Sequence, residues 1–311
     1  MGYKKIILLF GPTASGKSRL AIDIAKKLNG EIVNADSMQV YKEIKILSAR
    51  PNESHIKHYM YGFVSAKEHF SVGKWYKLAS KKIKEINKKG KVALVVGGTG
   101  LYFKALTHGL VEIPDVPKID YTYLNAAGRF LIKKKYSKKH SKIFKGINLN
   151  DIQRISRAIS VYEATGITLS DWQKKENKKF FKKNEFIKIC LSPLKADLEK
   201  VIEKRFLNML KNGAIEEVKK YKKLSLYNHS PHTLNSIIGI NEIGSFLDKK
   251  VSMRELKEKV LIRTRQYAKR QLTWQRGQMK DWEGFSDTNY LDLRKKVLSY
   301  LSKTWPSLKL S

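Results

Sequence analysis

The chain has 311 residues, of which 63 are basic and 28 are acidic, so its formal net charge at pH 7 is +35. Its single cysteine, Cys190, excludes an intrachain disulfide and a cysteine-based zinc site, and no apolar run approaches the ~18 residues that a membrane-spanning helix needs. This surplus of positive charge predicts attraction to nucleic acid or an anionic membrane, although most of the basic residues are lysines, and a drift in composition could also produce it.

A glycine-rich loop stands between the first predicted strand and the first predicted helix. Residues 6–10 form a short apolar run, and apolar residues recur at helical spacing over 20–28. In this context, backbone N–H groups and the helix N-terminus bind phosphate, a lysine reaches the terminal phosphate, and a serine ligates Mg²⁺. The residues that fit this motif are Gly11, Pro12, Thr13, Ala14, Ser15, Gly16, Lys17 and Ser18.

Strands and helices continue to alternate as far as residue 112. We expect a second strand at 31–36, an amphipathic helix at 75–86 and a buried strand at 92–96. The alternation predicts an α/β fold: a P-loop NTPase-like core with a parallel sheet and helices on both faces. In such a sheet the ligand site lies at the carboxyl ends of the strands, where Asp36 and Gly97 fall. Because residues 1–5 lead directly into the first strand, we expect no signal peptide and a cytoplasmic protein.

Two prolines, Pro114 and Pro117, interrupt this pattern. We expect residues 114–185 to form an inserted, mostly helical lobe, with 1–113 and 186–311 forming the P-loop core. The lobe should contain an amphipathic helix. Its apolar stripe is Ile152, Ile155, Ile159 and Tyr162, and its opposite face carries Gln153, Arg154 and Arg157. After the lobe we expect a strand at 186–191 and helices at 197–223 and 253–280.

Several single residues could perform chemistry. Asp36 could accept a proton as a general base, although a carboxylate at a strand end could instead cap a helix or support Mg²⁺ from outside its ligand shell. Thr99 could face the site, or it could belong to a turn that only needs glycines. Arg205 could clamp a diphosphate, or it could form a surface ion pair. Basic Lys269, Arg270 and Arg276 suit phosphate contacts, and Trp274 could be a core residue or a stacking surface.

Together these stretches resemble the tRNA dimethylallyltransferases, also called tRNA isopentenyltransferases or IPP transferases, of the bacterial type. The resemblance spans residues 5–282. The matching stretches, in chain order, are residues 11–18, 36–42, 97–106, 153–158, 202–206 and 269–274.

The resemblance implies transfer of a dimethylallyl group from dimethylallyl diphosphate to N6 of adenosine 37, just 3′ of the anticodon, in tRNAs that read codons beginning with U. It implies that Asp36 takes the N6 proton, and that Thr13, Lys17, Ser18 and Arg205 hold the diphosphate with Mg²⁺. We expect a monomer. The residues that the resemblance assigns to tRNA binding are Asp36, Ser37, Met38, Gln39, Thr99, Gln153, Arg154, Ile155, Ser156, Arg157, Lys269, Arg270, Gln271, Trp274 and Arg276.

The sequence departs from the family pattern at four places. Leu47-Ser48 stand where the family often has Gly-Thr, and Tyr121 lies where an arginine is frequent. Ser236 replaces a basic or amide residue, and Ile240-Asn241 replace a Tyr-Lys or Tyr-Arg pair. These differences concern tRNA contacts more than the diphosphate site.

Two other functions compete with prenyl transfer. A P-loop kinase would need an acidic magnesium site and a lid of arginines, and the sequence shows neither clearly. A non-catalytic RNA-binding protein would not need intact Lys17, Ser18 and Asp36.

Overall fold

The computed structural model describes residues 5–51, 55–117, 119, 121, 126–140, 142–148, 150–224 and 232–306. The chain divides into two compact units. One unit, here called the core unit, comprises Met1–Thr107 and Phe181–Ser311. The other, the lobe unit, is His108–Phe180, so it starts and ends several residues before the lobe limits predicted from the sequence.

One parallel sheet organises the core unit. The strands in the described part of the chain follow the order β3-β2-β4-β1-β5-β6, and every pairing between them is parallel. Strands β1, β2 and β4 are buried at every position, as is usual where both faces of a parallel sheet are covered. This confirms the predicted fold class. The strands are β1 (Ile6–Phe10), β2 (Gly30–Asn34), β3 (His58–Tyr59), β4 (Val92–Gly97), β5 (Phe186–Leu191) and β6 (Glu283–Phe285).

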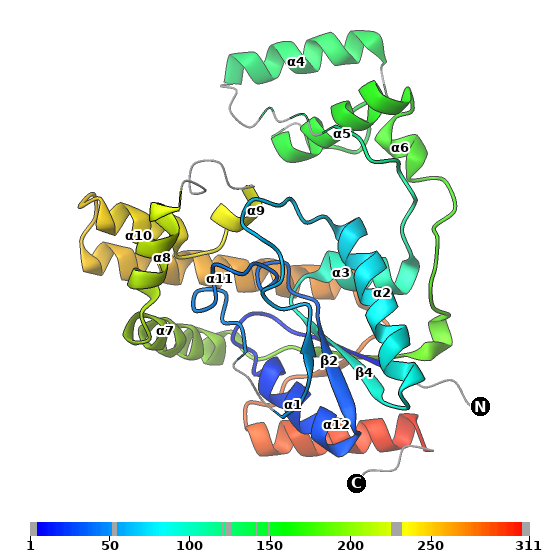
Figure 1. The fold of residues 1–311 in the computed structure, drawn as a ribbon, viewed down its shortest axis with the longest axis vertical. Helices are drawn as coiled ribbons and strands as arrows, with labels where there is room; N and C mark the ends of the chain where they lie inside the picture. The colour runs from blue at the N-terminus through cyan, green and yellow to red at the C-terminus, as the bar shows by residue number, and fades with distance from the viewer. Residues whose placement is uncertain are drawn as a thin grey trace. The chain divides into compact units, whose positions relative to one another are not determined.

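Helices cover both faces of the sheet. Neighbouring residues of a strand point to opposite faces, so each contacts different helices. Leu9 belongs to the same apolar cluster as Leu20 of α1 and Val297 of α12. The next residue, Phe10, packs edge-to-face against Phe103 of α3, with 5.7 Å between the ring centroids. Figure 1 shows α1 and α12 together beside the sheet. These helices are α1 (Lys17–Lys27), α2 (Val72–Lys88), α3 (Gly100–His108) and α12 (Tyr290–Thr304).

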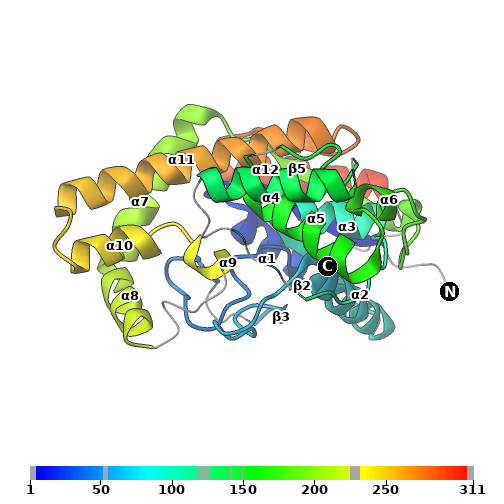
Figure 2. The same ribbon diagram turned by 90° about the horizontal axis from the view of Figure 1, so that it is seen from above.

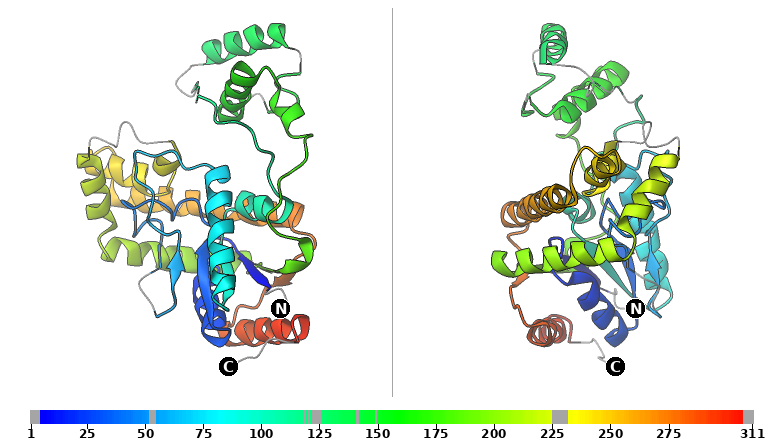
Figure 3. Two further views of the ribbon diagram at one scale, coloured as in Figure 1. Left: turned by 45° about the vertical axis from the view of Figure 1, so that its right-hand side comes forward. Right: turned by 90° about the vertical axis from the view of Figure 1, so that its left-hand side faces the viewer.

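A second helical layer packs against the loop that follows β2. Its apolar cluster joins Val40 and Leu47 of that loop with Phe206, Val218 and Ile243 from three helices. Figures 2 and 3 show α7, α8, α10 and α11 grouped together. The helices of this layer are α7 (Lys195–Lys211), α8 (Ala214–Lys223), α9 (His232–Asn235), α10 (Ile240–Leu247) and α11 (Met253–Gln278).

The single helix predicted at 197–223 is wrong, because α7 and α8 are separate. The chain turns at Gly213, whose φ of 94° lies in the left-handed region that favours glycine. The predicted helix at 253–280 is confirmed as α11. Its start is fixed by Ser252, whose hydroxyl accepts from the Glu255 N–H while Glu255 accepts from the Ser252 N–H.

The described part of the lobe unit is mainly helical and has its own small core. Tyr136, Ile143, Ile155 and Ile159 form that core, and the left-handed Gly166 ends α5. The helices of this unit are α4 (Ala126–Lys139), α5 (Ile152–Thr165) and α6 (Leu169–Trp172).

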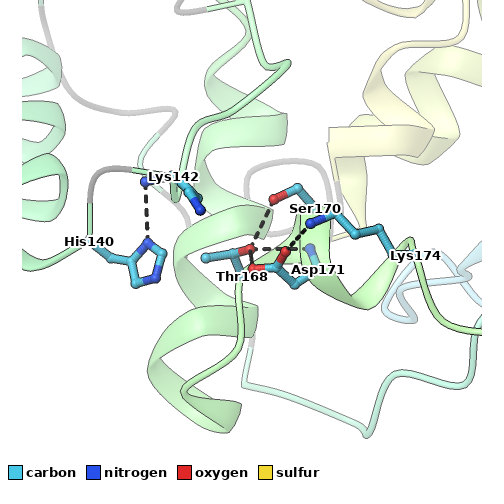
Figure 4. Close-up of polar contacts among 6 residues, drawn as sticks. All are labelled: His140, Lys142, Thr168, Ser170, Asp171 and Lys174. Carbon is cyan, nitrogen blue, oxygen red and sulfur yellow. Dashed lines mark hydrogen bonds and ion pairs between the residues drawn. The ribbon is translucent and has the colours of Figure 1, made fainter.

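Polar contacts fix the start of α6. The Thr168 hydroxyl accepts from the Asp171 N–H at 3.2 Å and donates to the Asp171 carboxylate at 2.7 Å, and Lys174 pairs with the same carboxylate at 2.6 Å. Figure 4 shows these contacts together with Ser170. No described helix combines the length and the apolar character that crossing a membrane requires.

Candidate active site

The glycine-rich loop lies where the sequence places it, between β1 and α1. The Gly11 N–H donates to the Gly97 carbonyl at 3.2 Å, which joins the loop to the end of β4. Ala14 and Gly16 both have positive φ values, of 65° and 78°. Helix α1 begins directly afterwards at Lys17. A curled loop that runs into a helix N-terminus presents backbone N–H groups to an anion.

Lys17 is half-buried, and its ammonium donates to the Pro12 carbonyl at 3.1 Å. Burial lowers the pKa of this ammonium to about 8, against an ordinary 10.5; the charge of Asp36 opposes the shift and that of Arg205 adds to it. An ammonium that is desolvated and not paired with a carboxylate binds an incoming anion strongly, because the anion supplies the missing counter-charge.

Arg205 reaches the loop from α7. Its Nη1 donates to the Thr13 hydroxyl at 2.8 Å. Burial lowers the pKa of the guanidinium, and the nearby Asp36 carboxylate partly restores it. Arg205 therefore faces the phosphate loop, and the alternative of a surface ion pair does not describe its position.

Asp36 follows the end of β2 and is 9% exposed. Its Oδ1 accepts from the Met38 N–H at 3.0 Å, and its own N–H donates to Asn34 Oδ1 at 2.8 Å. These contacts set the direction of the carboxylate. Asp36 also helps to raise the pKa values of Tyr61 and Tyr267, although burial of the two phenols is the larger cause. The Asp36 carboxylate thus lies near the Lys17 ammonium, the Arg205 guanidinium and buried phenols whose pKa values are raised.

Thr99 joins the ends of β2 and β4. Its hydroxyl accepts from the Ser37 N–H at 2.9 Å and donates to the Ser37 hydroxyl at 3.2 Å. A Cβ on Gly97 would lie 2.1 Å from the Ala35 carbonyl group, so only glycine permits this approach. Thr99 therefore holds the segment that contains Asp36.

Helix α11 packs against the phosphate loop through Gln271, whose surroundings differ from those expected of an RNA-facing residue. Its side chain is 5% exposed. Its Oε1 accepts from the Thr13 N–H at 2.8 Å, and its Nε2 donates to the Gly98 carbonyl at 2.8 Å. Trp274, one turn further along α11, is half-buried with its ring against Gly100, which favours the core interpretation of this residue.

Two adjoining cavities in the core unit meet at Arg205 and Met209. The first, of about 770 Å³, is lined by loop residues 14–19 and by α7. The second, of about 270 Å³, is lined by Thr13, Asp36 and Arg205, by apolar side chains such as Phe206 and Met209, and by polar side chains of α11, among them Arg263, Tyr267 and Arg270. The phosphate loop and the Asp36 carboxylate therefore lie beside a cavity of mixed polar and apolar lining.

The remaining candidates divide by exposure. On α5, Gln153, Arg154 and Arg157 are exposed on one face, as predicted. Ile155 and Ser156 are buried: Ile155 packs in the lobe core, and the Ser156 hydroxyl accepts from the Tyr121 N–H at 3.1 Å. These two positions form the interior of the lobe instead of the face expected for tRNA. Three further candidates are exposed on α11: Lys269, Arg270 and Arg276.

Ser37, Met38 and Gln39 are half-buried beside Asp36. The Gln39 amide donates to the carbonyls of Ser48 and Ala49, at 2.9 and 3.0 Å. Gln39 therefore holds the next loop in place from within the site.

Sequence reasoning missed Glu217 of α8. Its carboxylate accepts three consecutive N–H groups, from Lys45, Ile46 and Leu47, at 2.6, 2.7 and 3.0 Å. The lysine-rich sequence around Glu217 looks like an ordinary solvated helix, so nothing local marks this contact.

Comparisons with known proteins agree with this geometry. The IPP transferase family model matches residues 39–278. A tRNA dimethylallyltransferase of Pelagibacter ubique is 45% identical over 285 residues, which cover 89% of this chain and 90% of that protein. The enzyme of the same name from Parvibaculum lavamentivorans is 39% identical over 307 residues, covering 96% of each chain.

Solved structures are similar as well. The full-length tRNA isopentenylpyrophosphate transferase of Bacillus halodurans superposes with a TM-score of 0.71 at 27% identity, over 98% of this chain and 97% of that one. A eukaryotic dimethylallyltransferase acting on tRNA superposes with a TM-score of 0.78 at 27% identity, over 98% of this chain and 80% of that one.

Proposed function

We propose a reaction from the premise that the chain belongs to the IPP transferase family. The protein is a tRNA dimethylallyltransferase. It transfers a dimethylallyl group from dimethylallyl diphosphate to N6 of adenosine 37 in tRNAs that read codons beginning with U, and it releases diphosphate. One observation supports this reaction above the others: Asp36 lies in the same site as Thr13, Lys17 and Arg205.

The phosphate loop holds the diphosphate of the donor. Loop N–H groups, the Lys17 ammonium and the Arg205 guanidinium supply positive charge, and the Thr13 hydroxyl lies beside Arg205. The diphosphate is the leaving group, so its negative charge grows as the bond to the dimethylallyl carbon breaks. Donors already fixed in place stabilise that charge without reorganising, which lowers the barrier.

The transfer balances without an oxidant or a reductant. The bond from N6 to the first carbon of the dimethylallyl group forms, and the bond from that carbon to the diphosphate oxygen breaks. The electron pair of the broken bond leaves with the diphosphate. The proton lost from N6 passes to Asp36, whose carboxylate is held by the Met38 N–H and is available as a base.

Mg²⁺ is the expected cofactor. The Ser18 hydroxyl is exposed at the N-terminus of α1 and lines the cavity beside the phosphate loop, so its oxygen fits a magnesium ligand there. Mg²⁺ keeps several waters and binds chiefly through substrate phosphates, so a site with few protein oxygens suits it. The bound ion would neutralise part of the diphosphate charge.

The anticodon arm of the tRNA is the proposed macromolecular substrate. Its adenosine must leave the base stack to reach Asp36. We assign its binding to the exposed Gln153, Arg154 and Arg157 of α5 and to the exposed basic residues of α11. We also propose that the enzyme acts as a monomer in the cytoplasm.

A label-transfer experiment tests this function. The protein is incubated with unmodified tRNA and Mg²⁺, together with either dimethylallyl diphosphate labelled in its prenyl group or ATP labelled in its terminal phosphate. We expect tRNA to gain label only from the prenyl donor. Label from ATP alone would support a kinase, and label from neither would support an RNA-binding protein without this activity.

A further inference from the structure

Helix α11 presents one face to the smaller cavity. Gln271 anchors this helix to the phosphate loop, since its side chain bonds the Thr13 N–H and the Gly98 carbonyl. Tyr267 lies four residues earlier, on the same face of the helix. The anchor therefore holds Tyr267 towards the cavity. The residues of α11 that line the cavity recur every three or four positions, and they are Val260, Arg263, Thr264, Tyr267 and Arg270.

The Tyr267 phenol lies near both charged groups of the site. It lines the same cavity as Asp36 and Arg205. Burial raises the pKa of this phenol, and the charge of Asp36 raises it further, while the charges of Arg270 and Arg205 oppose the shift. The hydroxyl therefore carries its proton at neutral pH and can donate a hydrogen bond.

The Tyr267 hydroxyl has no hydrogen-bond partner in the part of the chain that the structure describes. The ring is held from one side, where the Arg270 guanidinium lies 5.7 Å from its centroid. A desolvated tyrosine hydroxyl usually has a hydrogen-bond partner. A molecule bound in the cavity would supply the acceptor that these residues do not.

Adenine offers the pattern that fits this pair of side chains. Its N6 amino group donates hydrogen bonds, and the ring nitrogens N1 and N7, which lie on either side of that group, accept them. Asp36 accepts from N6 in the proposed reaction, so a donor near Asp36 can bond one of these nitrogens. Guanine carries the oxygen O6 in place of N6, and O6 would face the carboxylate as a second acceptor.

We propose that Tyr267 recognises the acceptor base: its hydroxyl donates to N1 or N7 of the adenine whose N6 faces Asp36. The carboxylate and the hydroxyl together orient N6 and discriminate adenine from guanine. This role of Tyr267 rests on the proposed prenyl transfer and adds base recognition to the phosphate contacts assigned to α11.

The experiment removes the two sides of this hydrogen bond in turn. Full-length tRNAs are assembled from synthetic fragments with adenosine, 1-deazaadenosine or 7-deazaadenosine at position 37. Each deaza base keeps N6 and replaces one ring nitrogen with a C–H group. The kcat/KM of prenyl transfer is measured on each tRNA for wild type and for Tyr267→Phe, which keeps the ring and loses only the hydroxyl.

Tyr61→Phe is the matched control. Tyr61 is also a phenol near Asp36, and burial raises its pKa too, but this described residue lines neither of the two cavities. Tyr61→Phe should therefore match wild type on all three tRNAs.

With adenosine 37, we expect Tyr267→Phe to lower kcat/KM by about 5–150-fold, because it leaves a desolvated acceptor unpaired. On one of the two deaza tRNAs, Tyr267→Phe should lower kcat/KM no further than wild type. On the other, its full effect should remain. Each comparison is made on the same tRNA, so a change in the reactivity of N6 caused by the deaza base cancels. Inhibition by pyrophosphate should be the same in Tyr267→Phe and wild type.

Two results would overturn the proposal. An equal loss in Tyr267→Phe on all three tRNAs would show that the hydroxyl bonds neither ring nitrogen, and weaker inhibition by pyrophosphate in the same variant would assign the hydroxyl to the diphosphate. An unchanged kcat/KM on adenosine 37 would remove Tyr267 from base recognition. Transfer by wild type to adenosine 37 is measured in the same assay, so failure of the proposed function is seen separately.

Discussion

Arg205 donates a hydrogen bond of 2.8 Å to the Thr13 hydroxyl, joining helix α7 to the phosphate loop over a separation of 192 residues. This contact places a guanidinium at the point where the two cavities meet. The same guanidinium can therefore hold the diphosphate and fix the direction in which the prenyl group leaves it.

Replacing Arg205 should weaken diphosphate binding. Arg205→Ala removes a cation from a leaving group whose charge grows in the transition state, so we expect kcat to fall by about 10²–10³ and inhibition by pyrophosphate to weaken. Glu203→Ala, two residues away on the exposed side of α7, is the control and should change neither. Unchanged pyrophosphate inhibition in Arg205→Ala would remove this residue from the diphosphate site.

Replacing Asp36 should separate chemistry from tRNA binding. Asp36→Asn keeps the size of the side chain and an oxygen for the Met38 N–H but removes the base. We expect single-turnover rates to fall by ~10²–10⁴, with tRNA affinity nearly unchanged. A near-normal single-turnover rate would show that another group accepts the N6 proton.

Diphosphate binding should depend on pH through Lys17. In the free protein, the pKa of the Lys17 ammonium is lowered to about 8. A bound diphosphate raises this pKa, because its negative charge favours the protonated ammonium. Affinity for pyrophosphate is therefore full below pH 8 and falls as the pH rises above 8, by up to about tenfold per pH unit.

Two variants of Lys17 control for the titration of pyrophosphate itself. Lys17→Arg keeps its charge and should remove this fall, and Lys17→Ala should bind weakly at every pH. Calorimetric titrations of wild type and both variants between pH 7 and 10 measure the effect. An identical fall in Lys17→Arg and wild type would assign the pH dependence to the ligand.

Gln271 should act on the phosphate loop and not on the RNA. Gln271→Ala leaves the Thr13 N–H and the Gly98 carbonyl without their partner, which costs about 1–3 kcal/mol. We expect a lower melting temperature and a higher KM for dimethylallyl diphosphate, with an unchanged salt dependence of tRNA binding. Lys269 is exposed on the same helix. Lys269→Ala should leave the melting temperature and the KM for dimethylallyl diphosphate unchanged and should weaken the salt dependence of tRNA binding.

The exposed face of α5 should bind phosphates of the anticodon arm. Replacing Arg154 and Arg157 together with Ala should raise KM for tRNA and leave KM for dimethylallyl diphosphate unchanged. The slope of log affinity against log salt is negative, and its magnitude should decrease by about 1.4–1.8. A matched variant that neutralises Lys134 and Lys138 of α4 should change the slope less; a larger change there would move the RNA face to α4.

Sequence reasoning found the parts of the site that lie close together along the chain. The phosphate loop, the strand ending before Asp36 and the strand ending at Gly97 each carry a local pattern, and parallel strands bring their ends to one edge. The two shortest strands, β3 and β6, were missed because two or three residues carry no usable periodicity.

The contacts that complete the site join distant parts of the chain. Gln271 pairs with Thr13 across 258 residues and Glu217 with Leu47 across 170, and no local spacing indicates either pairing. Ser156 was assigned to tRNA binding because it lies in a stretch that matches a motif. Such a stretch contains buried as well as exposed residues, and the match does not distinguish them. The Ser156 hydroxyl belongs to the interior of the lobe.

The position of the transferred group on the tRNA tests the proposed reaction most directly. Unmodified tRNA is treated with the protein, Mg²⁺ and dimethylallyl diphosphate, digested to nucleosides and oligonucleotides, and analysed by mass spectrometry. We expect wild type to add one dimethylallyl group, on N6 of adenosine 37, and Asp36→Asn to add it at a rate lower by at least ~10². A prenyl group at any other nucleotide, or an undiminished rate in Asp36→Asn, would contradict the proposed reaction.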